Sequence, residues 1–79
     1  MTPTYPRDAL DKGTTGWVDL EFTVTAEGRV TDVVVTASEP KHVFDAAATY
    51  ALTHSRYQPV VRDGVPVALR VRLRERFQP

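Results

Sequence analysis

Arginines alternate with other residues near the C-terminus of this 79-residue chain, at Arg70, Arg72, Arg74 and Arg76. In a β-strand a spacing of two places side chains on one face. Guanidinium groups pair with carboxylates through parallel hydrogen bonds, so such a row can bind acidic groups. Two interpretations stay open: charges that keep an edge strand from aggregating, or an edge that accepts an extended peptide while the arginines select an acidic or polar partner.

Residue types that carry catalysis or bind metals are few and poorly spaced. His42 and His54 are the only histidines, and neither has a second strong ligand at a metal-binding spacing. Asp19 and Glu21 stand two apart, but arginines beside them would lower both pKa values rather than raise one for acid catalysis. No Gly-rich phosphate loop or nucleophile motif is present. The sequence predicts no catalytic residue, metal site or cofactor, and therefore no enzyme.

Composition limits the partners. Ten basic and ten acidic residues give a net charge of zero, so no overall basic field attracts nucleic acid. Only Phe77 and Trp17 could supply the stacking aromatics of a nucleic-acid platform, so that third hypothesis is weak and no nucleic acid is expected. With 42% hydrophobic and 25% charged residues, the chain has the composition of one globular domain, residues 1–79, with a core over about 5–77.

The elements of the first half follow from periodicity. Pro6 suits the first turn of a short helix over residues 6–12, and Gly13 suits its end. Apolar and polar residues alternate over 16–24, which predicts a half-buried strand. A polar loop containing Gly28 leads to a β-branched run over 30–37, so a hairpin is expected.

The second half is predicted as a helix and a strand. Ser38 can cap a helix that Pro40 opens, although His42 is an equally good start, and the helix should end near Ser55. Phe44 belongs to the stripe expected to face the sheet. Alternation then resumes in a single strand after the turn at residues 63–64.

These elements predict an α+β fold, a two-layer sandwich (αββαβ) in which two helices cover one face of a three-stranded antiparallel sheet. Pairing the last strand with the first sets Asp19 and Glu21 beside Arg70 and Arg72, where opposite charges contribute roughly 0.2–1 kcal/mol each. The second strand offers only Asp32 on that face. The expected strand order is therefore 2-1-3, with the last strand at an edge.

A series of short motifs runs from residue 5 to residue 77. It comprises Tyr5-Pro6, Gly16-x-Val18-x-Leu20-x-Phe22, Glu27-Gly28-Arg29-Val30-x-x-Val33, Ser38-x-Pro40, Phe44-Asp45-x-Ala47-Ala48-x-x-Ala51-Leu52, Arg56-Tyr57-x-Pro59 and Asp63-Gly64-x-Pro66-Val67. In this order and spacing the chain resembles the C-terminal domain family of TonB, the periplasmic energy transducer of Gram-negative bacteria. It departs from that family in a more flexible Gly13-Thr14-Thr15 link and in a more basic last strand.

The resemblance implies a role in transport. Such domains couple the proton-motive force, harvested by ExbB and ExbD in the inner membrane, to outer-membrane transporters of siderophore-bound iron, cobalamin and similar cargo. The last strand of the domain pairs with the TonB box, a short extended segment of the transporter, and Tyr5 and Pro6 match the motif near that segment. The partner-binding strand here would comprise Ala68, Leu69, Arg70, Val71, Arg72, Leu73, Arg74, Glu75 and Arg76.

The resemblance also leaves alternatives. The transmembrane helix and Pro-rich spacer of such transducers are missing from the sequence, so we expect a domain excised from a longer periplasmic protein anchored in the inner membrane. A TolA-like or accessory TonB-like module would bind another envelope protein, although Tyr5-Pro6 and Arg56-Tyr57-x-Pro59 favour TonB. The free edge could also exchange strands with a second copy, giving a homodimer.

Overall fold

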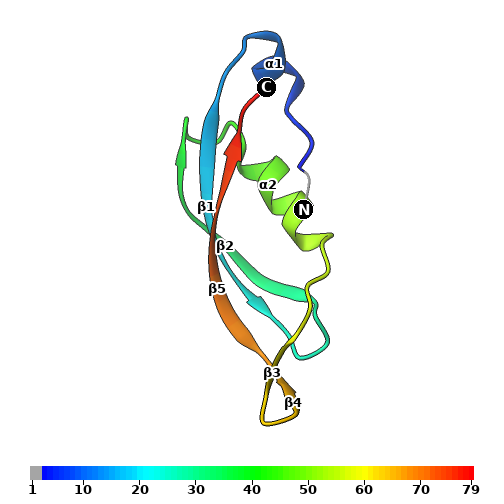
Figure 1. Ribbon diagram of the computed structural model, residues 1–79. Helices are drawn as coiled ribbons and strands as arrows, with labels where there is room; N and C mark the ends of the chain where they lie inside the picture. Colours follow the sequence, from blue (N-terminus) through cyan, green and yellow to red (C-terminus); the bar gives the residue numbers. More distant parts are fainter. Residues whose placement is uncertain (1–2) are drawn as a thin grey trace.

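The computed structural model describes residues 3–79. Along the chain lie α1 (Arg7–Asp11), β1 (Gly16–Val24), β2 (Val30–Glu39), α2 (Asp45–Thr53), β3 (Val60–Arg62), β4 (Val65–Val67) and β5 (Leu69–Phe77). Strands β2, β1 and β5 form an antiparallel sheet in that order, α2 packs on it, and the β3–β4 hairpin extends beyond it (Figure 1). The predicted α+β fold and its 2-1-3 strand order are confirmed.

The central strand β1 organises the sheet. Its alternate residues Val18, Leu20, Phe22 and Val24 are all buried, so the apolar residues that alternate in the sequence form the face of β1 that lies in the core. β1 pairs with β5 without a break over nine residues, from Gly16 opposite Phe77 to Val24 opposite Leu69. Its bounds agree with the predicted 16–24.

β2, the other neighbour of β1, pairs with it less regularly than β5 does and is longer than predicted. Two register shifts interrupt the β1–β2 pairing, and Asp32 has a positive φ of 54°. β2 continues to Glu39, because Ser38 and Glu39 pair with Val18 and Trp17. Backbone paired in β2 cannot begin a helix at Ser38, and His42 has a positive φ of 64°, outside the helical region. The predicted helix start at 38–42 was therefore wrong, and α2 begins at Asp45.

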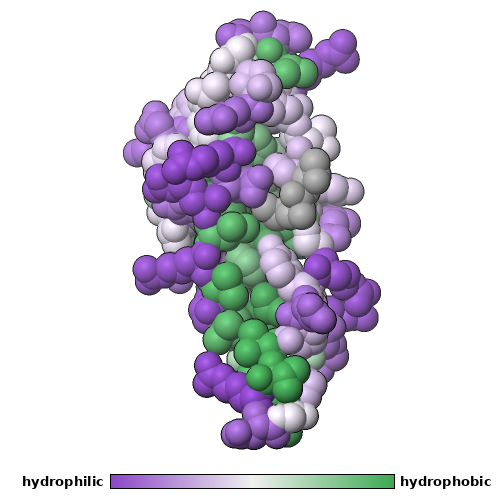
Figure 2. Space-filling model, viewed as in Figure 1, coloured by the Kyte–Doolittle hydropathy of each residue, from purple (hydrophilic) through white to green (hydrophobic). Residues whose placement is uncertain are grey.

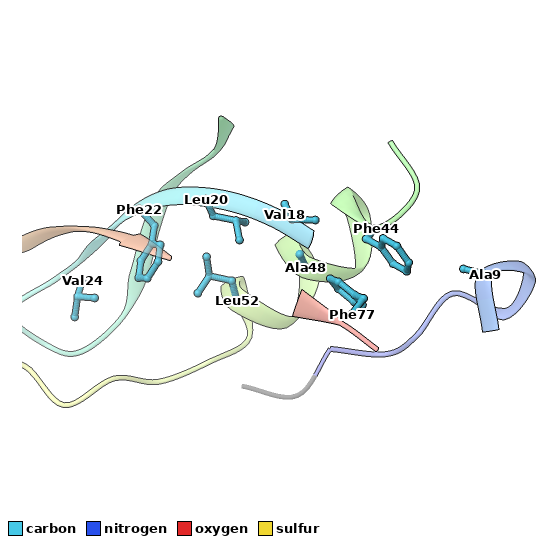
Figure 3. Packing of buried hydrophobic residues seen from close by; sticks show 9 residues of the cluster. All are labelled: Ala9, Val18, Leu20, Phe22, Val24, Phe44, Ala48, Leu52 and Phe77. Carbon is cyan, nitrogen blue, oxygen red and sulfur yellow. The ribbon is translucent and has the colours of Figure 1, made fainter. Parts of the chain in front are cut away.

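Aromatic rings close the core at one end. Phe44, at the N-terminus of α2, stacks on Phe77 with ring centroids 4.4 Å apart. Figure 3 shows both rings within the buried cluster, which comprises Ala9, Val18, Leu20, Phe22, Val24, Phe44, Ala48, Leu52 and Phe77. A Cβ at Gly16 would lie 2.7 Å from the Phe44 ring and against the Glu39 carbonyl, so this close approach requires glycine.

The first helix is shorter than predicted. α1 occupies Arg7–Asp11, within the expected 6–12, and Ala9 is its buried residue. Gly13 follows it with a φ of +66°, the left-handed conformation that ends helices. No helix of residues 3–79 is long and apolar enough to cross a bilayer.

The predicted last strand is divided in two. Asp63 and Gly64 both have positive φ, the conformation of a tight two-residue turn, and they join β3 to β4. Residues 65–67 consequently pair with 60–62 instead of with β1. Ala68 lies between β4 and β5 and belongs to neither strand, so the expected edge begins at Leu69.

Candidate partner-binding edge

The outer edge of β5 is the longest regular open edge of the sheet. Within residues 3–79, β5 pairs with β1 alone, which leaves its other side without a partner strand. Unpaired N–H and C=O groups along such an edge can pair with an added strand. β2 is also an edge, but its bulged pairing and the positive φ of Asp32 interrupt it. β5 therefore offers the continuous template.

One face of this edge carries the arginine row, Arg70, Arg72, Arg74 and Arg76. The register sets Arg72 opposite Glu21 and Arg74 opposite Asp19, whereas Arg70, which was predicted beside these carboxylates, lies opposite Thr23. Arg74 donates two hydrogen bonds to the Asp19 carboxylate, from Nε at 2.7 Å and from a terminal nitrogen at 2.9 Å. Its guanidinium also lies 3.9 Å from the centre of the Trp17 ring. Arg74 is thus paired with side chains of its own sheet.

The Arg74 pair changes the titration of both partners. The hydrogen bond from Arg74 lowers the pKa of the Asp19 carboxyl, and the charges of Arg74 and Arg76 lower it further. The same hydrogen bond raises the pKa of Arg74. Asp19 is therefore a carboxylate at neutral pH.

The other arginines are less completely paired. Arg72 is 85% exposed, and its Nε lies 3.6 Å from a Glu21 oxygen. Arg70 donates to the Thr23 hydroxyl and to the Asp32 carbonyl, which are neutral acceptors. Arg76 is exposed and forms no ion pair with a carboxylate among the described residues. The arginine row consequently retains positive charge that its own sheet does not neutralise.

The opposite face of the edge is apolar. Leu69, Val71 and Leu73 alternate with the arginines and are half-buried, and we call them the apolar strip. α2 packs mainly on β2 and β1, and Val71 and Leu73 pack against the buried core while staying partly exposed. Figure 2 shows hydrophobic residues down the middle of the lower half of the molecule, with hydrophilic residues on either side. Glu75 then introduces a half-buried charge before Phe77 closes the core.

The motif at the beginning of the domain meets the end of the same edge. The Tyr5 ring packs edge-on against Phe77 of β5, with centroids 5.9 Å apart, and against Phe44 at 5.4 Å. The Tyr5 hydroxyl donates to the Thr14 carbonyl. Pro6 directly precedes α1 as its N-cap residue. Tyr5 and the β5 strand, both predicted as partner-binding residues, are therefore brought together.

The histidines and acidic residues form no metal cluster in the part of the chain that the structure describes. His42 lies on the surface 3.8 Å from Asp45. His54 ends α2 and stacks on Tyr50, with its Nδ1 2.8 Å from the Tyr50 carbonyl oxygen. Both positions are those of surface side chains near helix ends.

The whole chain, residues 1–79, matches the family described as "Gram-negative bacterial TonB protein C-terminal". The chain belongs to the TonB C-terminal domain family. It is 39% identical over 66 residues to Protein TonB of Pseudomonas aeruginosa, an alignment that covers 84% of this chain and 19% of that protein. It is 33% identical over 78 residues to Protein TonB of Vibrio cholerae, covering 99% of this chain and 32% of that protein. The chain therefore spans a minor part of these relatives.

Solved TonB structures share the fold. The solution NMR structure of the Pseudomonas aeruginosa TonB C-terminal domain superposes with a TM-score of 0.86 at 34% identity, covering all of this chain and 80% of that one. The TonB2 protein of Vibrio anguillarum gives 0.76 at 33% identity, covering 98% and 74%. TonB proteins are envelope transducers of Gram-negative bacteria with a periplasmic C-terminal domain, and they are not enzymes.

The contact between Gly28 and Tyr57 was not predicted from the sequence. Gly28 was interpreted only as a turn residue, but its carbonyl accepts a 2.9 Å hydrogen bond from the Tyr57 N–H. A Cβ at Gly28 would run into the Tyr57 carbonyl. The Tyr57 ring lies 5.7 Å from Phe22, and burial raises the pKa of its hydroxyl. The β1–β2 turn thus holds the segment that leads to the β3–β4 hairpin. In the sequence, only the two motifs Glu27-Gly28-Arg29 and Arg56-Tyr57-x-Pro59 indicated this contact.

Proposed function

We propose that this chain is the periplasmic partner-binding domain of a TonB energy transducer. It grips the TonB box of outer-membrane transporters by adding that segment as a fourth strand beside β5, over Leu69–Phe77. The observation that carries this proposal is the continuous open edge of β5, which pairs with β1 over its whole length and has no partner strand on its outer side among residues 3–79. Ala68 then lies just before the binding strand.

Strand addition suits a protein that transmits force. Backbone hydrogen bonds recur along both strands, so a pull directed along them loads several bonds together. Tyr5 packs against Phe77, so the N-terminal end of the domain contacts the same strand that would hold the transporter. In the full-length protein, energy would arrive from ExbB and ExbD through an inner-membrane anchor preceding this domain. This energy would drive the uptake of siderophore-bound iron or of vitamins by the transporter.

Strand pairing can be tested with backbone-modified peptides. A peptide copying a TonB box is made in two versions, with N-methyl groups on alternate residues in one frame or in the other. A strand added to an edge points alternate N–H groups toward it, so one frame should abolish binding and the other should retain it. Amide shifts of the isotope-labelled domain report both the affinity and the site.

The expected shifts concentrate on the amides of β5, with those of β2 less affected. Equal affinity for the two N-methylated versions would contradict strand pairing. Absence of any shift on β5 at saturating unmodified peptide, with the domain folded and monomeric, would overturn the transporter-binding proposal. The TolA-like or accessory role with another envelope protein would then take its place.

A further inference from the structure

We propose that the β5 edge selects a partner strand in which acidic and apolar side chains alternate, and that Arg72 and Arg76 are the residues that recognise the acidic positions. This inference rests on the proposed function and specifies the chemistry of the segment bound. The observation behind it is that the two faces of one strand differ: exposed arginines on one side and the apolar strip on the other.

Geometry assigns the two faces of the partner. In a sheet, side chains directly opposite each other on neighbouring strands lie on the same face, with Cβ atoms about 4.5–5.5 Å apart. A strand added beside β5 therefore sends every second side chain toward the arginine row and the others toward the apolar strip. A partner with charges on both faces would bury some of them against Val71 and Leu73, which are half-buried already.

Only two members of the arginine row can serve the partner. Arg74 is held by Asp19 and Trp17, and its side chain is 43% exposed. Arg70 is directed across the sheet, toward the Asp32 carbonyl of β2 and away from the open edge. Arg72 and Arg76 remain, and their separation of four residues corresponds to about 13 Å along a strand. Acidic side chains of the partner should therefore be four residues apart.

The residues between them define the rest of the pattern. The partner positions that face Val71 and Leu73 should be apolar, because these apolar side chains are only half-buried and an added strand would cover their exposed part. The position facing Arg74 carries no charge requirement, since that guanidinium is already paired. The position facing Glu75 should not be acidic. From residue 71 to residue 76 the partner pattern is apolar, acidic, apolar, unrestricted, non-acidic, acidic.

The test compares peptides of one composition in two orders. One peptide carries glutamate and valine in the pattern above, and the other carries the same residues with the glutamates and valines in separate blocks. The patterned peptide should bind at least about tenfold more tightly, because only it can place every charge on the arginine face. A third peptide with lysine in place of glutamate should bind more weakly than either.

Variants of the domain identify the recognising residues. Arg72→Gln and Arg76→Gln should each weaken the patterned peptide several-fold, and Arg72→Glu should weaken it further and improve binding of the lysine peptide. Arg62→Gln, on the exposed strand β3 away from the arginine row, is the matched control and should change nothing. The glutamine variants remove charge without setting Glu21 against a new carboxylate, so the fold is expected to persist.

The outcomes separate this inference from the function on which it rests. Equal binding of the two orders, or an affinity that ignores Arg72 and Arg76, would overturn the inference while frame-dependent N-methyl effects still supported strand addition. Lack of any peptide binding at β5 would overturn both. Loss of affinity in Arg62→Gln equal to that in Arg72→Gln would show general charge attraction and would also refute selection by this edge.

Discussion

Replacing Phe44 by alanine should destabilise the domain severely. The ring is fully buried, stacks on Phe77 at 4.4 Å and meets the edge of Tyr5 at 5.4 Å. Truncating a buried phenylalanine to alanine costs about 3–5 kcal/mol, and aromatic pairs account for roughly 0.5–1.5 kcal/mol of such losses beyond area alone. A 79-residue domain has a free energy of unfolding of about 4–12 kcal/mol. Phe44→Ala should therefore remove between about a quarter and all of this stability, and a domain near the lower end of the range would be substantially unfolded.

The measurement is urea denaturation of wild type, Phe44→Ala and Phe44→Leu, followed by circular dichroism. The leucine variant keeps most of the apolar volume but loses the stacked ring, so it should fall between the other two. Tyr50→Ala is the control on the same helix, because Tyr50 is 65% exposed and its loss should change the free energy of unfolding by less than about 1 kcal/mol. A loss of under about 1 kcal/mol in Phe44→Ala would refute the packing of α2 on the end of the sheet.

Two further predictions concern the turn and the ion pair. Gly28→Ala should cost about 1–3 kcal/mol by urea denaturation, because it combines positive-φ strain with a collision against Tyr57. Gly13 also has a positive φ, +66° against +83° at Gly28, but has open space around it, so Gly13→Ala should cost less. Equal losses would refute the contact between Gly28 and Tyr57. The Asp19 carboxyl should titrate below its ordinary pKa of 3.8 by NMR and return toward that value in Arg74→Gln. The pKa of Asp19 is lower in the folded state than in the unfolded state. The stabilisation from its carboxylate is therefore present above the unfolded-state pKa and is lost as the pH falls through the folded-state pKa. An unchanged Asp19 pKa in Arg74→Gln would contradict the assignment of the shift to the Arg74 hydrogen bond.

Prediction succeeded where local pattern and tertiary environment agree. The bounds of β1 and the strand order followed from alternation and opposite charge. The carboxylates do lie beside the arginine row, but opposite Arg72 and Arg74 and not, as predicted, Arg70 and Arg72. The predicted start of α2 was wrong. Ser38 and Pro40 are typical of a helix start, but pairing with β1 holds residues 38–39 in the sheet. Ala68 was placed in the binding strand because alternation alone does not reveal that residues 65–67 fold back onto 60–62.

For the candidate site too, some features could be predicted from the sequence and others could not. Residue types spaced by two determined that β5 has a charged face and an apolar face, since side-chain direction in a strand depends only on parity. Which arginines are engaged could not be read from the sequence, because four identical residues at equal spacing differ only in what surrounds them. The contacts of Arg74 with Trp17 and Asp19, and of Arg70 with β2, distinguish them.

The sequence by itself therefore determined the classes of the main elements, the two faces of β1 and β5 and the family of the domain, because these depend on residue type and on spacing along the chain. The tertiary structure alone decided which edge is continuous, that the apolar strip stays partly exposed and how Tyr5 reaches Phe77. These features depend on contacts between residues distant in sequence. Such contacts compete with local preferences, and packing determined the outcome at each of these positions.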